Sequence, residues 1–182
     1  SGTIALNAGN AAGTITFSGG ASTFPAALNL TSTAAGGITQ STGISVTGTT
    51  TLAAGAGNNI TLDNAANNFS TVAVTSGNNV TLRDAGAIDL GTSTVSGVLS
   101  VTAGGNITES GALDVAAGAS TFTINTALLA DVLIGTQANN FAGQTVTFNE
   151  AAGGTIRDVS LRNTSAVAVY PTITTAGNPT PS

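Results

Sequence analysis

The stretch from Gly57 to Gly97 contains two similar units in direct succession. GNNITLDNAANNFSTVAVTS (57–76) is followed at once by GNNVTLRDAGAIDLGTSTVSG (77–97). The first six residues of the two units, GNNITL and GNNVTL, match at a spacing of twenty residues. A period of about twenty residues with short β-type segments inside it is typical of the coils of a parallel β-helix. The sequence therefore predicts an all-β solenoid with coils of about 20 residues.

Apolar residues in these units alternate with Thr, Ser or Asp, as they do in strands that bury one face. Each unit holds too few of them to close a core alone, so the units must stack on one another. The alternation predicts six core side chains: Ile60, Leu62, Val80, Leu82, Ile88 and Leu90. The residues expected on the outer face are Thr61, Thr81, Arg83 and Asp89.

Paired asparagines open both units and should lie at the same corner of successive coils. Stacked asparagine side chains form hydrogen-bonded ladders along the axis of other stacked-strand structures. We therefore expect a structural ladder made by four residues: Asn58, Asn59, Asn78 and Asn79.

The chain of 182 residues should fold as one β-helix domain over residues 1–170, with regular coils over about 38–161. About nine coils would account for this length. Residues 171–182 contain three of the four prolines and predict an irregular tail or linker. The segment ALLADVL (127–133) has helical propensity but is too short to stand alone, so we predict a strand or a corner there.

A longer repeat of about seventy residues overlies the shorter one. ITQSTGISV (38–46) resembles ITESGALDV (107–115), and segments 60–69 and 132–141 both end in ANNF. This alignment makes Arg83-Asp84 equivalent to Arg157-Asp158. We expect both pairs to be exposed ion pairs or solvated turns at corners.

Charged residues make up only 6% of the chain, and the only cations are Arg83, Arg157 and Arg162. Nucleic acids and anionic membranes are bound by basic patches, which this composition cannot provide. The sequence also has no apolar run near eighteen residues, so membrane insertion is not expected. The absence of cysteine is compatible with secretion, because a long stack of strands does not need disulfides.

Catalytic chemistry is restricted by the absence of histidine and cysteine. Ser-His-Asp and Cys-His nucleophiles and the usual zinc sites are excluded. Paired carboxylates could still cleave a polysaccharide on this fold, but the eight acidic residues are scattered. They are Asp63, Asp84, Asp89, Glu109, Asp114, Asp131, Glu150 and Asp158. The calcium-binding β-roll nonapeptide is absent too, so we expect no enzyme, no metal and no cofactor.

Two further patterns have mainly structural explanations. Six N-x-S/T triplets begin at Asn29, Asn59, Asn68, Asn79, Asn106 and Asn163. Most coincide with the start of an expected strand, although attachment of glycans is an alternative. Thr-x-Thr triplets at 31–33, 49–51 and 92–94 could form an ice-binding array. They do not share one coil period, which disfavours that function.

The segments NNITLDNAANNF, NNVTLRDAGAIDLGTSTVSG and LSVTAGGNITESGALDV resemble the repeats of very large bacterial secreted adhesins of the filamentous-haemagglutinin or β-strand-repeat type. The resemblance covers about residues 28–161. It implies a right-handed parallel β-helix at a bacterial cell surface or in a biofilm matrix, with host or matrix glycans as partners.

Two functions follow as hypotheses. The chain could be a rigid segment of an adhesin, or a subunit that assembles end to end with other copies into an extracellular filament.

Overall fold

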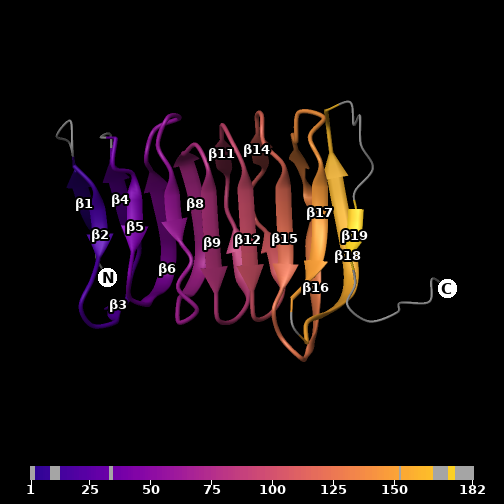
Figure 1. Ribbon diagram of the computed structural model, residues 1–182, viewed down its shortest axis with the longest axis horizontal. Coiled ribbons are helices and arrows are strands. Elements are labelled where there is room, and N and C mark those ends of the chain that lie inside the picture. The colour runs from indigo at the N-terminus through magenta and orange to yellow at the C-terminus, as the bar shows by residue number, and fades with distance from the viewer. Residues whose placement is uncertain (1–2, 9–12, 33–34, 152, 166–171, 175–182) are drawn as a thin grey trace.

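The structure is a computed structural model that describes residues 3–8, 13–32, 35–151, 153–165 and 172–174. The described residues form 19 β-strands and no helix. All strand pairs are parallel and stack along one axis (Figure 1), which confirms the predicted β-solenoid. None of the described segments forms a helix long and apolar enough to cross a membrane.

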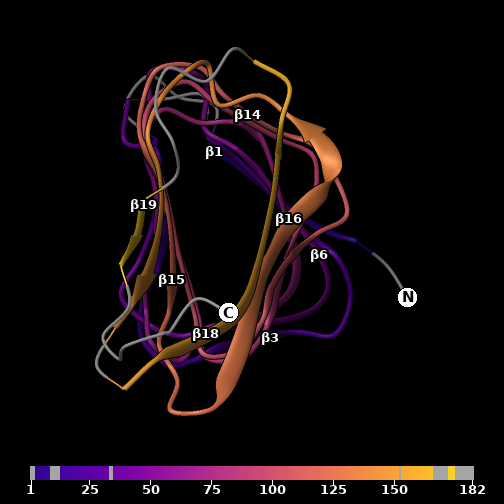
Figure 2. The same cartoon turned by 90° about the vertical axis from the view of Figure 1, so that its right-hand side faces the viewer.

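Three sheets form the sides of the solenoid (Figure 2). The nine-stranded sheet contains β1 (Ile4–Ala8), β3 (Ser22–Phe24), β4 (Leu28–Ser32), β6 (Ile44–Ala53), β8 (Asn68–Ser76), β10 (Ile88–Leu90), β13 (Ile107–Glu109), β16 (Leu129–Asn139) and β18 (Thr155–Asn163). The eight-stranded sheet contains β2 (Ile15–Phe17), β5 (Ile38–Gln40), β7 (Ile60–Leu62), β9 (Val80–Asp84), β12 (Leu99–Ala103), β15 (Ser120–Ile124), β17 (Val146–Glu150) and β19 (Thr172–Thr174). The two-stranded sheet contains β11 (Ser93–Val95) and β14 (Leu113–Val115).

Every turn passes from the eight-stranded sheet to the nine-stranded sheet and back, and two turns also contain a strand of the two-stranded sheet, β11 or β14. After β9 in the eight-stranded sheet, β10 lies in the nine-stranded sheet, β11 in the two-stranded sheet, and β12 returns to the eight-stranded sheet. We call the bend from the eight-stranded to the nine-stranded sheet the first corner. The second corner follows the nine-stranded sheet, and the third corner leads back to the eight-stranded sheet.

The turns are longer and fewer than the sequence suggested. Ile60 pairs with Val80 at the expected spacing of twenty residues, but Ile38 pairs with Ile60 after 22 and Ser120 with Val146 after 26. The described chain makes about seven turns of roughly 22 residues, so the expectation of nine coils was wrong. The physical reason is that corner loops vary in length while strand register is kept.

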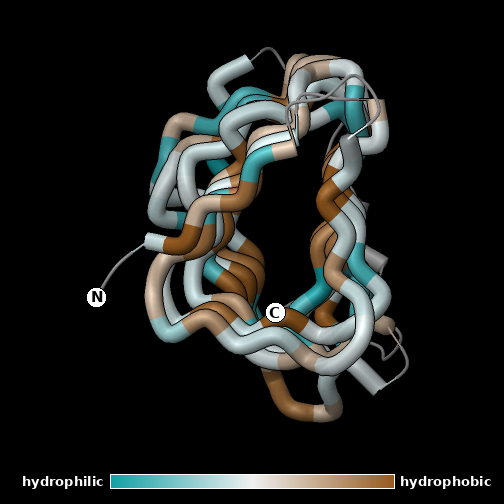
Figure 3. Tube along the Cα trace, turned by 90° about the vertical axis from the view of Figure 1, so that its left-hand side faces the viewer, coloured by the Kyte–Doolittle hydropathy of each residue, from teal (hydrophilic) through white to brown (hydrophobic). Residues whose placement is uncertain are grey.

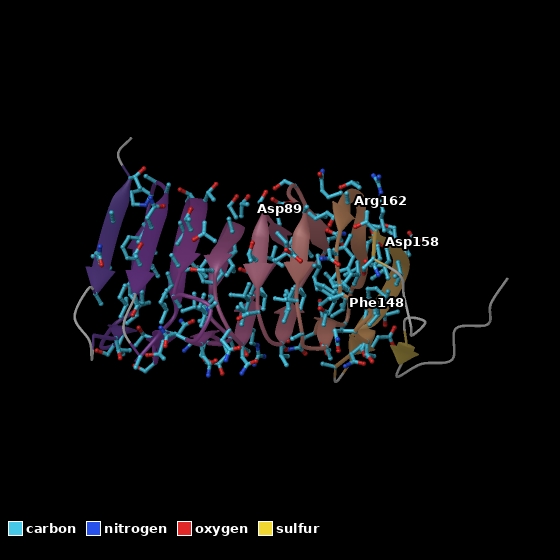
Figure 4. The ribbon with its side chains drawn as sticks, turned by 90° about the horizontal axis from the view of Figure 1, so that it is seen from above. Asp89, Phe148, Asp158 and Arg162 are labelled. Atoms are coloured by element: carbon cyan, nitrogen blue, oxygen red, sulfur yellow. The ribbon has the colours of Figure 1, made fainter. Side chains whose placement is uncertain are left out.

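The core is continuous along the stack because apolar side chains of successive turns lie in register. The six predicted core residues, from Ile60 to Leu90, are all buried, with at most 2% of their surface exposed. Farther along, the ring of Phe122 stacks on that of Phe148 at 5.9 Å and meets Phe141 edge-on. Figure 3 shows the alternation of apolar and polar residues around the coil, and in Figure 4 Phe148 lies inside it.

Close contact between turns restricts one glycine. Gly37 has a φ of 66°, and a Cβ added there would lie 2.2 Å from the carbonyl oxygen of Asn59 in the next turn. Only glycine tolerates both the left-handed backbone and this contact. Gly37 therefore fixes the position of the chain just before β5.

Stacking extends into the segment for which irregular structure was predicted. Thr172, Ile173 and Thr174 form β19 and pair in parallel with β17. The other residues of the predicted tail lie outside the described part of the chain. The segment 127–133 joins β16 from Leu129 onward, as the preference for strand or corner predicted.

Candidate functional site

The acidic residues are distributed over separate corners and faces. No group of three or more His, Cys, Asp or Glu side chains within the described ranges is arranged to hold a metal ion. Asp89 accepts hydrogen bonds from Thr108 and Ser110 on the outside of the coil (Figure 4), and Asp114 accepts one from Asn140.

Three polar side chains connect successive turns at the first corner: Gln40, Asn67 and Asp84. Asn67 is fully buried. Its Nδ2 donates to Gln40 Oε1 at 2.8 Å and to the carbonyl oxygens of Leu62 and Arg83, while its Oδ1 accepts from the Ile44 N–H at 3.0 Å. One side chain thus bonds to three consecutive turns and satisfies backbone groups that the corner would otherwise leave unpaired.

Asp84 completes this stack and is 2% exposed. Its carboxylate accepts backbone hydrogen bonds from Phe69 at 2.5 Å and from Gly86 at 2.7 Å. Burial raises the pKa of Asp84 above its ordinary value of 3.8, and the two N–H donors partly oppose the shift. The prediction of an exposed Arg83–Asp84 ion pair or a solvated turn was wrong, because the carboxylate is used to bond the backbone of its own and the preceding turn.

The second corner contains a corresponding stack: Glu109, Asn139 and Asn163. Asn139 Nδ2 donates to Glu109 Oε2 at 2.8 Å and to the Ile134 carbonyl oxygen, and its Oδ1 accepts from the Leu113 N–H. Asn163 Oδ1 accepts from the Phe141 and Ser165 N–H groups, each at 3.2 Å. The two stacks therefore use the same arrangement at different corners.

This correspondence explains the long sequence repeat and corrects its last part. One turn is roughly 22 residues, so residues about seventy apart in the sequence are separated by three full turns and one further side of the coil. A residue at the first corner therefore corresponds to one at the second corner. By hydrogen bonding, the counterpart of Leu82-Arg83-Asp84 is Leu161-Arg162-Asn163. The alignment of Asp84 with Asp158 was wrong, since Asp158 is exposed (Figure 4) and lies within β18.

The third corner contains the four asparagines predicted to form a ladder. Asn78 Nδ2 donates to Asn59 Oδ1 at 3.3 Å, and the Asn79 N–H donates to the same oxygen at 3.2 Å. Asn79 Oδ1 then accepts from the Val98 N–H, whereas Asn58 Nδ2 bonds to the Ala54 carbonyl oxygen within its own turn. The side chains of these asparagines therefore bond mainly to backbone groups. Only one of the bonds described here, between Asn78 and Asn59, joins two side-chain amides of successive turns.

Arg157 forms both ion pairs found among the described residues. Its guanidinium bonds Asp131, which is 4% exposed, and more weakly the exposed Asp158 at 3.1 Å. The hydrogen bond with Asp131 is the main reason that the pKa of Arg157 is raised further above its ordinary value. Because the Arg157 side chain is exposed, its charge neutralises the buried Asp131 carboxylate from the protein surface.

The outer face of the eight-stranded sheet presents a column of threonines. From β2 to β17 the second residue of each strand pairs in register with the next, in the order Thr16, Thr39, Thr61, Thr81, Ser100, Thr121 and Thr147. Thr16 is exposed and the six that follow are half-buried. We call this set the threonine column.

The Thr-x-Thr triplets considered in the sequence do not form this column. Thr31 pairs with Ala53, and Thr94 pairs with Asp114. The sequence signal for the column is different: in most strands of this sheet an aliphatic residue is followed by Thr, as in Ile38-Thr39 and Val146-Thr147. The spacing of these dipeptides varies too much for a fixed period to find them.

Comparison with known protein families assigns the chain to a family of repeats. A family described as "Repeats of unknown function (DUF5649)" matches residues 1–76 and 77–149. The chain belongs to this repeat family. The boundary between the two DUF5649 matches falls between Ser76 and Gly77, where the first quoted unit ends and the second begins. Searches of curated proteins and of solved structures each found no match. The likeness of this DUF5649 chain to filamentous-haemagglutinin-type adhesins stays a prediction.

Proposed function

We propose that this DUF5649 chain is a rigid structural segment of a bacterial secreted or surface-anchored adhesin, acting in cell adhesion or in a biofilm matrix. The observation that supports the proposal is the unbroken apolar core, which extends from Ile15 in β2 to Phe148 in β17. Parallel strands bond successive turns along its sides, so bending the described stack would break many hydrogen bonds at once. Such a segment holds an adhesive part at a distance from the cell.

Corner networks support the same role. Asn67 and Asn139 each bond side chains and backbone of neighbouring turns, and these bonds resist sliding of one turn over the next. Neighbouring repeats above and below are the natural partners of each turn. Host or matrix glycans are further proposed partners, outside the cell.

Deletion of one turn tests the rod directly. Ile60 and Val80 are register partners, so removing residues 60–79 joins Asn59 to Val80 at an equivalent position. We expect a folded protein whose length, measured by small-angle X-ray scattering, falls by about 4.8 Å. Removal of residues 60–69 alone is the matched control, because half a turn destroys the register. A folded half-turn variant, or a full-turn variant that loses its β-structure, would contradict the rod.

The second candidate is a filament subunit, favoured by one observation. Ile4 and Leu6 of β1 occupy core columns above Leu28 and Leu30, yet each is 39% exposed. Strand β1 is an edge of its sheet and has no charged residue to block pairing with another chain. A second copy stacked there would form a head-to-tail, open-ended assembly.

Sedimentation velocity separates the two candidates. A filament subunit sediments as a series of large species, and Leu6→Lys reduces them to monomer. The matched control is Asn7→Lys, which changes the outer side of the same strand. A chain that is monomeric before and after both changes favours the rod segment.

A further inference from the structure

The threonine column has a regularity that strand pairing alone does not require. The outward column of the nine-stranded sheet contains Thr49, Thr71, Asp89, Thr108, Leu133 and Ser160, although those strands are also paired in parallel. High β-propensity explains some threonines on any strand. It does not explain why six of the seven successive strands from β2 to β17 have Thr at one position and the seventh has Ser.

The eight-stranded sheet also keeps a more uniform register than the other large sheet. Pairing of β6 with β8 and of β16 with β18 includes register shifts, whereas the pairs that carry the threonine column have none. The column is therefore spaced by the strand separation, about 4.8 Å. Figure 2 shows the strands of this sheet superimposed along the axis.

A partial second column runs beside the first. Thr102 and Thr123 lie two residues beyond Ser100 and Thr121, on the same face. Residues two apart on a strand are separated by about 6.7 Å. The face thus presents hydroxyl and methyl groups in two neighbouring columns, and in the second column Arg83 pairs with Thr102 and Asn149 pairs with Thr123.

The chemistry of the two columns favours a ligand that repeats in the same way. Each threonine hydroxyl donates one hydrogen bond and accepts up to two, and its branched side chain has few rotamers to lose. In the column, Thr16 Oγ1 lies 3.2 Å from Thr39 Oγ1, so these two hydroxyls share a hydrogen bond. A discrete ligand is normally held by convergent, varied groups in a cavity. A periodic face of hydroxyl and methyl groups, in which Arg83 is the one charged residue named, instead suits a crystalline lattice of water.

We propose that the threonine column, with Thr102 and Thr123 beside it, is an ice-binding face. The groups on it would replace lattice positions of the outermost ice layer, with hydroxyls bonding to ordered water and methyl groups lying between water rows. This activity goes beyond the proposed rod function and does not depend on it.

Adsorption to a growing ice hemisphere and thermal hysteresis of the purified chain test the proposal. We expect the wild type to enter the ice and to show hysteresis, and Thr121→Tyr to lose most of both, because a ring would hold the face away from the lattice. Thr71→Tyr, at a half-buried outward position of the nine-stranded sheet, is the matched control and should retain both. Circular dichroism verifies that each variant keeps its β-structure.

Thr121→Val provides a second variant that conserves shape if the tyrosine variant does not fold. It removes the hydroxyl and should lower hysteresis by less than the tyrosine does. Exclusion of the wild type from ice overturns the proposal. Equal losses in the Thr121 and Thr71 variants also overturn it, as does adsorption to insoluble cellulose without adsorption to ice.

Discussion

Asp84 and Asn163 accept the same pair of backbone hydrogen bonds, although only one of them can carry a charge. Asp84 bonds the N–H groups of Phe69 and Gly86, and Asn163 bonds those of Phe141 and Ser165. The corner therefore requires an acceptor and not a charge. Asp84 accepts the two bonds at different oxygens, Oδ2 and Oδ1, whereas Asn163 accepts both at Oδ1, so an amide can make them without the cost of burying an ion.

Asp84→Asn should remove a pH dependence of stability. The native pKa of Asp84 is raised by burial, so the folded state retains its proton at pH values where the unfolded state has lost it. Stability therefore falls as pH rises from the ordinary carboxyl value of 3.8 through the raised native value.

Thermal melting across that range checks this prediction. The difference in stability between Asp84→Asn and wild type should grow in favour of the variant as pH rises. Asn163→Asp is the reciprocal variant and should acquire the dependence that Asp84→Asn loses. A difference that is constant with pH would show that Asp84 does not titrate differently on folding.

Asn67→Ala should be among the most destabilising polar substitutions in the chain. It leaves the Ile44 N–H and the Leu62 carbonyl oxygen without their side-chain partner in a buried corner. The expected cost is about 3 kcal/mol, measured by denaturant unfolding. The neighbouring Asn68 is exposed, so Asn68→Ala should cost about 0.5 kcal/mol or less. Equal costs would mean that the corner network does not stabilise the fold.

Val80→Asp and Thr81→Asp separate the two faces of β9. Val80 is fully buried, and a charge there should cost several kcal/mol. Thr81 lies half-buried on the outer face, where a carboxylate keeps much of its hydration and should cost about 1 kcal/mol or less. Urea unfolding of both variants measures the difference. Similar losses of stability at the two positions would show that the register described for β9 is wrong.

Gly37→Ala should destabilise the chain by about 2 kcal/mol or more, because it combines a left-handed backbone with a clash against Asn59. Gly57→Ala is the matched control, since an added Cβ there meets no atom within 4 Å. The control should be neutral or slightly stabilising, as the substitution reduces the entropy of the unfolded chain. Comparable stability of the two variants would refute the contact between turns.

Local patterns in the sequence were sufficient for the fold class and for the core. The alternation around Ile60, Val80 and Leu90 identifies inward side chains, because the period of two in a β-strand is a property of the backbone itself. The repeated GNN segments likewise predict stacked turns, since equivalent corners need equivalent residues. These inferences require no knowledge of which turns touch.

Only the tertiary structure decided what lies beside what. Corner loops of different length change the spacing between paired strands of the eight-stranded sheet from 19 residues, between Val80 and Leu99, to 26, between Ser120 and Val146. A search for residues at one fixed period therefore does not find the threonine column, although its members lie at equivalent positions of successive strands. For the same reason, residues that correspond in the seventy-residue repeat lie at different corners of the coil. The structural counterpart of Asp84 is therefore Asn163 and not Asp158. Burial and register depend on the summed lengths of all intervening loops, which no local pattern contains.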